Sequence, residues 1–241
     1  MKAFLLAAGF GTRLKPFTNE HPKALADVNG KSLLERNILY LQRWGVEEVV
    51  VNVHHFAEQI IQTLQEHKGF GSRVLISDES DAVLETGGGL KRAAPLLQDS
   101  EPFLMMNVDV LCDFDVHRML QAHQQTHALA TLAVQKRPSS RALLFDRGGQ
   151  LSGWTNFKTG ERRIVRPVVQ EQLTAFAFSG IQMLSQSFLT KMRREGKFSI
   201  IESYLDLCPA ETISAWEHTG DAWLDVGRPE SLEQARRLFQ D

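Results

Sequence analysis

Glycine and cationic residues gather near the start of the chain in a pattern that suits phosphate chemistry. The short apolar run 3–8 is followed by small, hydroxyl and cationic residues: Gly9, Gly11, Thr12, Arg13 and Lys23. Glycines let the backbone turn and approach a ligand closely, while free backbone N–H groups and cations hold phosphate oxygens. This stretch therefore predicts a phosphate-binding loop at the carboxyl end of the first strand.

Three other interpretations of this loop explain less of it. A plain glycine turn between a strand and a helix does not require Arg13 and Lys23. A dinucleotide-binding fingerprint needs a third glycine where the chain has Leu14. A P-loop ending at residues 30–32 needs a glycine at the position of Leu25. Neither standard motif accounts for the stretch.

Two aspartates stand at the ends of later apolar runs. Asp109 follows the run 103–108, and Asp225 follows 222–224 and precedes a glycine two positions on. Open α/β proteins bind ligands outside the carboxyl ends of their strands, and carboxylates are ligands that Mg2+ prefers. An N-cap role for Asp109 is better filled by Asp113 or Asp115. Asp109 is therefore free to ligate a metal, and Asp225 has the same setting.

The elements that must position these residues alternate between strands and helices. Apolar runs predict strands at 3–8, 46–53, 73–77 and 103–109, and helical spacing predicts helices such as 33–44 and 56–67. This alternation predicts an α/β fold with one doubly wound, mostly parallel sheet. Residues 138–167 change to short strands and polar turns, which predicts a small antiparallel flap over the crevice.

Further glycines interrupt regular elements at two places. Gly87, Gly88 and Gly89 follow an acidic loop, and Gly180 interrupts the apolar strand 173–184. Consecutive glycines could form a loose hinge. We favour backbone surfaces that a flat or bulky ligand approaches closely.

One histidine pair has the spacing of a metal site. His123 and His127 are four apart on a predicted helix, so both can lie on one face. No third ligand is nearby in the sequence, and we expect solvated surface histidines.

The net charge and the cysteine content limit which partners and which compartment are expected. The formal net charge is −2, so no global basic field recruits nucleic acid or an anionic membrane. Cys112 and Cys208 are too few for a disulfide scaffold and suggest a reducing compartment. The apolar start is interrupted by Gly9, so it is neither a signal peptide nor a membrane span. A cytoplasmic protein is expected.

Several motifs together resemble the sugar-1-phosphate nucleotidyltransferases. They are the stretch 6–14 with Pro22 and Lys23, the run Asn107-Val108-Asp109, and residues 223–227. Within that family, residues 84–89 and 178–181 look most similar to the short N-acetylmuramate-1-phosphate uridylyltransferases, and mannose-1-phosphate guanylyltransferase-like proteins share much of the pattern. The resemblance covers nearly the whole chain.

The resemblance implies a reaction and an organisation. The enzyme would join a nucleoside triphosphate to a sugar 1-phosphate and release pyrophosphate, with Mg2+ as cofactor. A single Rossmann-like nucleotidyltransferase domain would span 1–241, with a nucleotide-binding half at 1–111 and a sugar-binding half at 112–241. We expect a monomer or small homo-oligomer.

The resemblance also implies roles for individual residues. The catalytic group would comprise Arg13, Lys23, Asp109 and Asp225, with the two aspartates ligating Mg2+. Gly11, Thr12 and Arg13 would hold the β- and γ-phosphates, and Lys23 the α-phosphate. Substrate contacts would come from Ala7, Ala8 and Gly9 at the nucleoside, Thr86 and Gly87 at the base and ribose, Asn107, and Gly180 at the sugar. Many relatives bind the sugar phosphate through the lysine of a Glu-Lys-Pro segment; here Lys158 and Arg166 are the candidates, and neither matches it cleanly.

The sequence does not determine which nucleoside triphosphate and which sugar 1-phosphate react. UDP-N-acetylmuramate synthesis from UTP is the first expectation; mannose-1-phosphate guanylyl transfer and glucose-1-phosphate thymidylyl or uridylyl transfer are alternatives. A non-catalytic sugar-nucleotide-binding regulatory protein could share the fold, but it would not need all four catalytic residues. A nicotinamide-dependent dehydrogenase lacks support without the third glycine.

Overall fold

The parallel part of the sheet is built around β1 (Lys2–Leu6). In the computed structural model, which describes residues 1–240, β1 pairs with β4 (Glu48–Val53) on one side and β6 (Phe103–Asn107) on the other. β5 (Arg73–Asp78) extends this parallel set beyond β4. Apolar and β-branched residues fill both faces of β1 and β4, as expected for strands covered on both sides.

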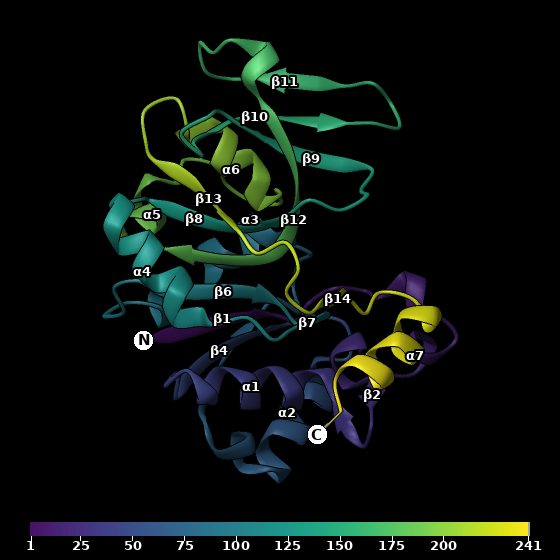
Figure 1. Cartoon of the computed structure of the whole chain (residues 1–241). Helices are drawn as coiled ribbons and strands as arrows, with labels where there is room; N and C mark the ends of the chain where they lie inside the picture. Colours follow the sequence, from purple (N-terminus) through teal and green to yellow (C-terminus); the bar gives the residue numbers. More distant parts are fainter. Residues whose placement is uncertain (241) are drawn as a thin grey trace.

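The sheet continues through antiparallel strands on the other side of β6. There β12 (Thr174–Leu184) pairs with β6, β8 and β9. The remaining strands of this half are β8 (Ala130–Gln135), β9 (Arg141–Phe145), β10 (Leu151–Asn156), β11 (Arg162–Ile164) and β13 (Ile213–Glu217). Figure 1 shows β9–β11 at one end of the molecule and α1 and α2 at the other. The predicted fold class is confirmed, and the predicted flap corresponds to β9–β11.

Helices cover both faces of the sheet. One face packs against α1 (Leu33–Arg43), α2 (Ala57–Glu66) and α4 (Val116–Thr126), and the other against α3 (Glu85–Ala93), α5 (Gln186–Lys191) and α6 (Ile200–Leu207). Successive β1 residues serve the two cores, since Leu5 lies in the first and Phe4 in the second. The sheet is therefore doubly wound.

Local capping explains where several helices begin. The Ser32 hydroxyl accepts a hydrogen bond from the Glu35 backbone N–H at 3.1 Å, and Asp115 caps α4 through the His117 N–H at 2.8 Å. Asp109 is thus not needed as a cap. No helix among residues 1–240 has both the length and the apolar character needed to cross a membrane.

A small third core ties the phosphate-binding stretch to the end of the chain. Leu14 packs with Val226 and with Ala235 of α7 (Pro229–Leu238). Val226 follows β14 (Trp223–Asp225), which pairs antiparallel with β7 (Val110–Cys112). A further two-stranded sheet, β2 (Asp27–Val28) with β3 (Lys31–Ser32), lies beside α7 (Figure 1). The phosphate-binding loop and the segment that carries Asp225 therefore pack on the same small apolar core.

The histidine pair on α4 differs from expectation. His123 is only 3% exposed, and its ring nitrogens lie 2.9 Å from the Thr131 hydroxyl and 3.1 Å from the Ser185 hydroxyl. The prediction of a solvated His123 is wrong, because the face of α4 that carries it packs on β8 and two hydroxyls satisfy its ring. His127 is exposed and ends the helix with a φ of 47°.

Burial of His123 predicts a pH-dependent stability. Burial lowers the pKa of His123 from 6.5 to about 4 in the folded state. The unfolded chain therefore binds this proton more readily, so the contribution is present above about pH 6.5 and is lost as pH falls towards 4. A shift of this size corresponds to at most ~3 kcal/mol. We expect His123→Gln to flatten the fall in unfolding free energy between pH 7 and 4.5, measured by urea denaturation.

The exposed His67 supplies a control. His67→Gln should leave the pH dependence of the wild type intact. An equally steep fall in the His123→Gln protein would contradict the assignment of that titration to His123.

Candidate active site

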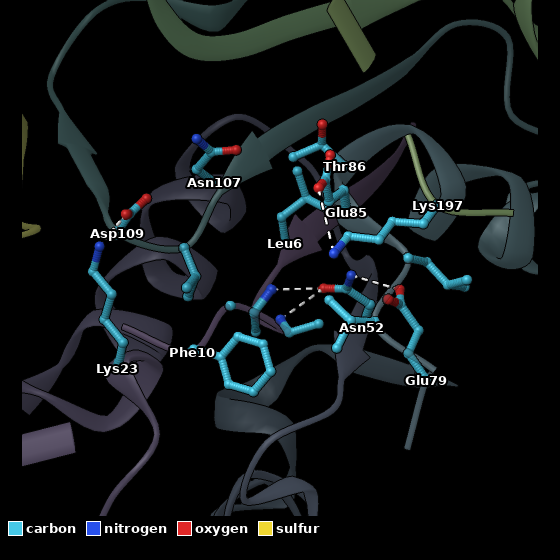
Figure 2. Close-up of a pocket in the computed structure, with 16 residues that line it drawn as sticks. Leu6, Phe10, Lys23, Asn52, Glu79, Glu85, Thr86, Asn107, Asp109 and Lys197 are labelled. Atoms are coloured by element: carbon cyan, nitrogen blue, oxygen red, sulfur yellow. Dashed lines mark hydrogen bonds and ion pairs between the residues drawn. The ribbon is translucent and has the colours of Figure 1, made fainter. Parts of the chain in front are cut away.

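A cavity of about 390 Å³ opens at the carboxyl ends of β1, β4 and β6. Its wall combines apolar side chains, glycine backbone and a few charges, as small-molecule sites commonly do. It is lined by Leu6, Ala7, Ala8, Gly9, Phe10, Lys23, Asn52, Glu79, Val83, Leu84, Glu85, Thr86, Asn107, Val108, Asp109 and Lys197. Figure 2 shows Lys23 and Asp109 on one side, and Glu79 and Lys197 on the other.

Asn52 fixes the chain where it leaves β1. Its side-chain oxygen accepts hydrogen bonds from the backbone N–H groups of Ala7 at 2.6 Å and Ala8 at 3.2 Å. Its amide donates to the Glu79 carboxylate at 2.7 Å (Figure 2). Burial raises the pKa of Glu79, and the hydrogen bond from Asn52 opposes that rise. Sequence reasoning did not find either residue, although a polar pair at the ends of neighbouring apolar strands was a usable signal.

Loss of this support should weaken nucleotide binding. In Asn52→Ala, two loop N–H groups and the buried Glu79 lose their partner, so the loop leaves its binding geometry. We expect the Kd for a nucleoside triphosphate to rise about tenfold, the equivalent of ~1.4 kcal/mol, measured by isothermal titration calorimetry. Gln65→Ala, an exposed change on α2, is the control and should bind like the wild type. Unchanged affinity in Asn52→Ala would contradict this role.

The four predicted catalytic residues meet at one edge of the cavity. The Lys23 ammonium contacts the Asp109 carboxylate, and Arg13 Nη2 lies 3.6 Å from Asp225 Oδ2. The backbone N–H of Val226 donates to the Asp109 carbonyl at 2.7 Å, which places Asp225 beside Asp109. Sequence position alone could not place Asp225 beside Asp109; the pairing of β14 with β7 does.

Two glycines allow this close arrangement. Gly11 has a φ of 61°, and a Cβ there would lie 2.9 Å from Cβ of Lys23. A Cβ on Gly227 would lie 2.7 Å from Arg13 Nη2 and 2.6 Å from Asp225 Oδ1. Larger residues would displace the cations and the carboxylate, so these positions require glycine for packing reasons.

The carboxylates fit a hard cation shared with a phosphate substrate. Asp225 Oδ1 is enclosed and has no hydrogen-bond partner among residues 1–240, which is costly unless another group satisfies it. Residues 1–240 hold no cluster of three or more metal-ligating side chains. Mg2+ typically binds one or two carboxylates together with substrate phosphates, so two aspartates are a sufficient protein contribution.

Comparison with known proteins fits this geometry. The family described as Nucleotidyl transferase matches residues 2–144. The chain is 32% identical to the N-acetylmuramate alpha-1-phosphate uridylyltransferase of Neisseria meningitidis over 99% of this chain and 98% of that protein. The chain belongs to the nucleotidyl transferase family. The family and enzyme class expected from the motifs are confirmed.

Two further relatives and one solved structure differ in how much of each chain the comparison covers. The N-acetylmuramate alpha-1-phosphate uridylyltransferase of Caulobacter vibrioides is 47% identical over 44% of this chain and 45% of its own. The mannose-1-phosphate guanyltransferase of Yarrowia lipolytica is 28% identical over 99% of this chain and 64% of its own. The crystal structure of HddC from Yersinia pseudotuberculosis shares the fold, with a TM-score of 0.78, 24% identity and 99% of each chain covered.

The glycine segment 87–89 of the nucleotidyl transferase has a structural explanation. These glycines lie inside α3, where a Cβ would meet Phe198 at 2.3 Å, Gly196 O at 2.2 Å or Glu79 Oε1 at 2.6 Å. Close approach of protein therefore accounts for these glycines, and Gly87 is not among the residues that line the cavity. Thr86 does line the cavity, and its hydroxyl accepts a hydrogen bond from the Ile200 N–H at 2.9 Å.

Of the two candidates for the sugar phosphate, Arg166 lies far from Gly180 along β12. Arg166 pairs with Asp146 at 3.6 Å, next to the Thr174 end of β12, about 20 Å along the strand from Gly180. Lys158 is exposed on the turn between β10 and β11. Gly180 itself has a φ of 74°, and a Cβ there would lie 2.8 Å from Asn107 Nδ2. Gly180 and Asn107 are thus together, whereas Arg166 is remote from them.

A Ser–His pair near Gly180 is structural. The Ser179 hydroxyl lies 2.8 Å from His218 Nε2, but Ser179 is completely buried. Burial, together with the positive charge of Arg137, lowers the pKa of His218 to about 4. A nucleophile must reach its substrate, so this pair instead holds the bulge that contains Gly180.

Proposed function

We propose that this nucleotidyl transferase transfers a nucleoside monophosphate from a triphosphate to a sugar 1-phosphate and releases pyrophosphate. The observation that carries the proposal is the meeting of Arg13 and Lys23 with Asp109 and Asp225 at the edge of the cavity. UTP and N-acetylmuramate 1-phosphate are the preferred pair, since two relatives carry that activity in their names.

The charges suit an attack between two anions. An oxygen of the sugar phosphate must approach the α-phosphorus of the triphosphate, so the reaction needs neutralisation and positioning more than a covalent nucleophile. Lys23 and Arg13 supply positive charge next to the cavity. Mg2+ held by Asp109 and Asp225 would neutralise further phosphate charge when bound. Because a phosphate dianion is already nucleophilic, no serine, cysteine or histidine is needed as a general base.

The cavity suits the nucleoside part of the triphosphate. Ala8 and Gly9 offer backbone to a ligand, and apart from the adjoining residues no atom of the described chain lies within 4 Å of where a Gly9 side chain would start. Leu6, Val83 and Leu84 add apolar surface for a base. A volume of about 390 Å³ is within the range of small-molecule sites.

A second candidate is guanylyl transfer to mannose 1-phosphate. It is favoured by the Yarrowia relative, which aligns with 99% of this chain. Thymidylyl or uridylyl transfer to glucose 1-phosphate is a third pair of the same reaction.

A pyrophosphate-release assay over a grid of substrates tests the proposal. The purified chain would be given UTP, GTP or TTP with N-acetylmuramate 1-phosphate, mannose 1-phosphate or glucose 1-phosphate, each with Mg2+. We expect release that requires both substrates and is fastest for UTP with N-acetylmuramate 1-phosphate. No release with any pair, combined with tight binding of a nucleotide sugar, would instead indicate a non-catalytic binding protein.

A further inference from the structure

Arg137 is a cation near Asp225, and it has no role in the reaction proposed above. It lies just beyond β8, between β12 and β14. Its Nη2 donates to the Phe178 carbonyl at 2.9 Å, and its guanidinium carbon lies 4.0 Å from the centre of the Trp223 ring. These contacts on two sides hold the side chain in one place.

The charge of Arg137 is poorly satisfied by the protein. Among residues 1–240 it forms no ion pair within 4 Å, and its buried Nε has no hydrogen-bond partner. Burial lowers the pKa of Arg137, and the negative charge of Asp225 raises it, so the two groups are within electrostatic reach. A guanidinium offers five donors suited to phosphate oxygens, and the carbonyl of Phe178 satisfies only part of that capacity.

The contacts of Arg137 join the wall of a second cavity to the strand that carries Asp225. Phe178 lines a second cavity of about 440 Å³ under the flap, together with Trp154, Arg141 and Glu202. On the other side, Trp223 comes two residues before Asp225, and its ring N–H donates to the Ser179 carbonyl at 2.8 Å. Arg137 is therefore fixed both to the wall of the second cavity and to the strand that carries Asp225.

We propose that Arg137 binds the phosphate of the acceptor, the sugar 1-phosphate, beside Asp225. This inference rests on the proposed function. A sugar in the second cavity would direct its phosphate past Phe178 towards the catalytic carboxylates, where Arg137 offers donors and positive charge. The neighbouring Lys136 does not share this role, because it pairs with Glu217 at 3.2 Å and lies over the Phe176 ring.

Arg137→Met and Arg137→Lys test the proposal against its matched neighbour, Lys136→Met. We expect Arg137→Met to raise the KM and the Kd for the sugar 1-phosphate about a hundredfold, with the Kd for the triphosphate changed less than about twofold. Arg137→Lys should recover about tenfold of that loss, because a point charge replaces the planar donors. Lys136→Met should match the wild type in both constants.

Binding measurements keep this test separate from the reaction. Calorimetry with each of the three sugar 1-phosphates, without triphosphate, needs no turnover, so a failed pyrophosphate assay would overturn the proposed function alone. An unchanged Kd for the sugar 1-phosphate in Arg137→Met would overturn the role of Arg137. So would a parallel loss of triphosphate affinity, which would indicate that Arg137 only supports Trp223 and β12. Absence of binding of all three compounds to the wild type would overturn it as well.

Discussion

Asp225→Asn is expected to lower kcat by about a thousandfold, equivalent to ~4 kcal/mol of transition-state stabilisation. The substitution keeps the shape of the side chain and removes its charge. Among residues 1–240, Asp225 Oδ1 has no hydrogen-bond partner, whereas Oδ2 faces Arg13 at 3.6 Å. Oδ1 is thus available to a group that arrives with the substrates, so loss of the negative charge should affect turnover more than the fold. Pyrophosphate release at varied Mg2+ concentration measures the effect.

The position of Asp225 permits a clean comparison. Its side chain is 41% exposed, so we expect the thermal midpoint of Asp225→Asn to stay near that of the wild type. Asp221→Asn changes an exposed carboxylate just before β14 and should retain full activity. Full activity in Asp225→Asn itself would refute the assignment of two carboxylates to the metal. Asp109→Asn is less informative, because Asp109 contacts the mostly buried Lys23 ammonium more closely than Asp225 contacts the exposed Arg13.

The parts of the site that the sequence predicted are those set by local physics. An apolar run followed by Gly9 and Gly11 defines the first strand and its loop, because strand length, burial and backbone freedom depend on neighbouring residues. The placement of Asp109 at the end of β6 follows from the general rule for open α/β sheets.

The residues that the sequence did not reveal depend on contacts between distant segments. Asn52 acts because β4 lies beside β1, and Arg137 acts because β8, β12 and β14 converge. The glycines at 87–89 show a second limit of reasoning from sequence. A glycine is equally required where protein or ligand approaches closely, and only the packing of α3 on Phe198 distinguishes the two. The exposure of His123 was predicted wrongly, because a helical pattern does not reveal that the hydroxyls of Thr131 and Ser185 lie against this face of α4.

Lys23→Met is expected to lower kcat by a hundredfold to a thousandfold, about the cost of removing one donor that stabilises transition-state charge. The Kd for the triphosphate should rise less than about tenfold. The Lys23 ammonium is balanced by Asp109, and its side chain is only 10% exposed. Negative charge that grows during phosphoryl transfer gains more from Lys23 than the ground state does. Steady-state kinetics together with calorimetric triphosphate binding separate the two effects.

The effect of losing the contact between Lys23 and Asp109 must be separated from the effect of Lys23 on the reaction. Lys23→Met leaves Asp109 without its cation, so part of any loss could come from a displaced carboxylate. The double variant Lys23→Met/Asp109→Asn measures the coupling between the two residues. Lys15→Met, an exposed lysine of the same stretch, controls for general loss of positive charge and should leave both constants unchanged. If Lys23→Met weakened triphosphate binding as much as it lowered kcat/KM, then Lys23 would act in the ground state, and neutralisation of the transition state would fall to Arg13 and the metal carboxylates.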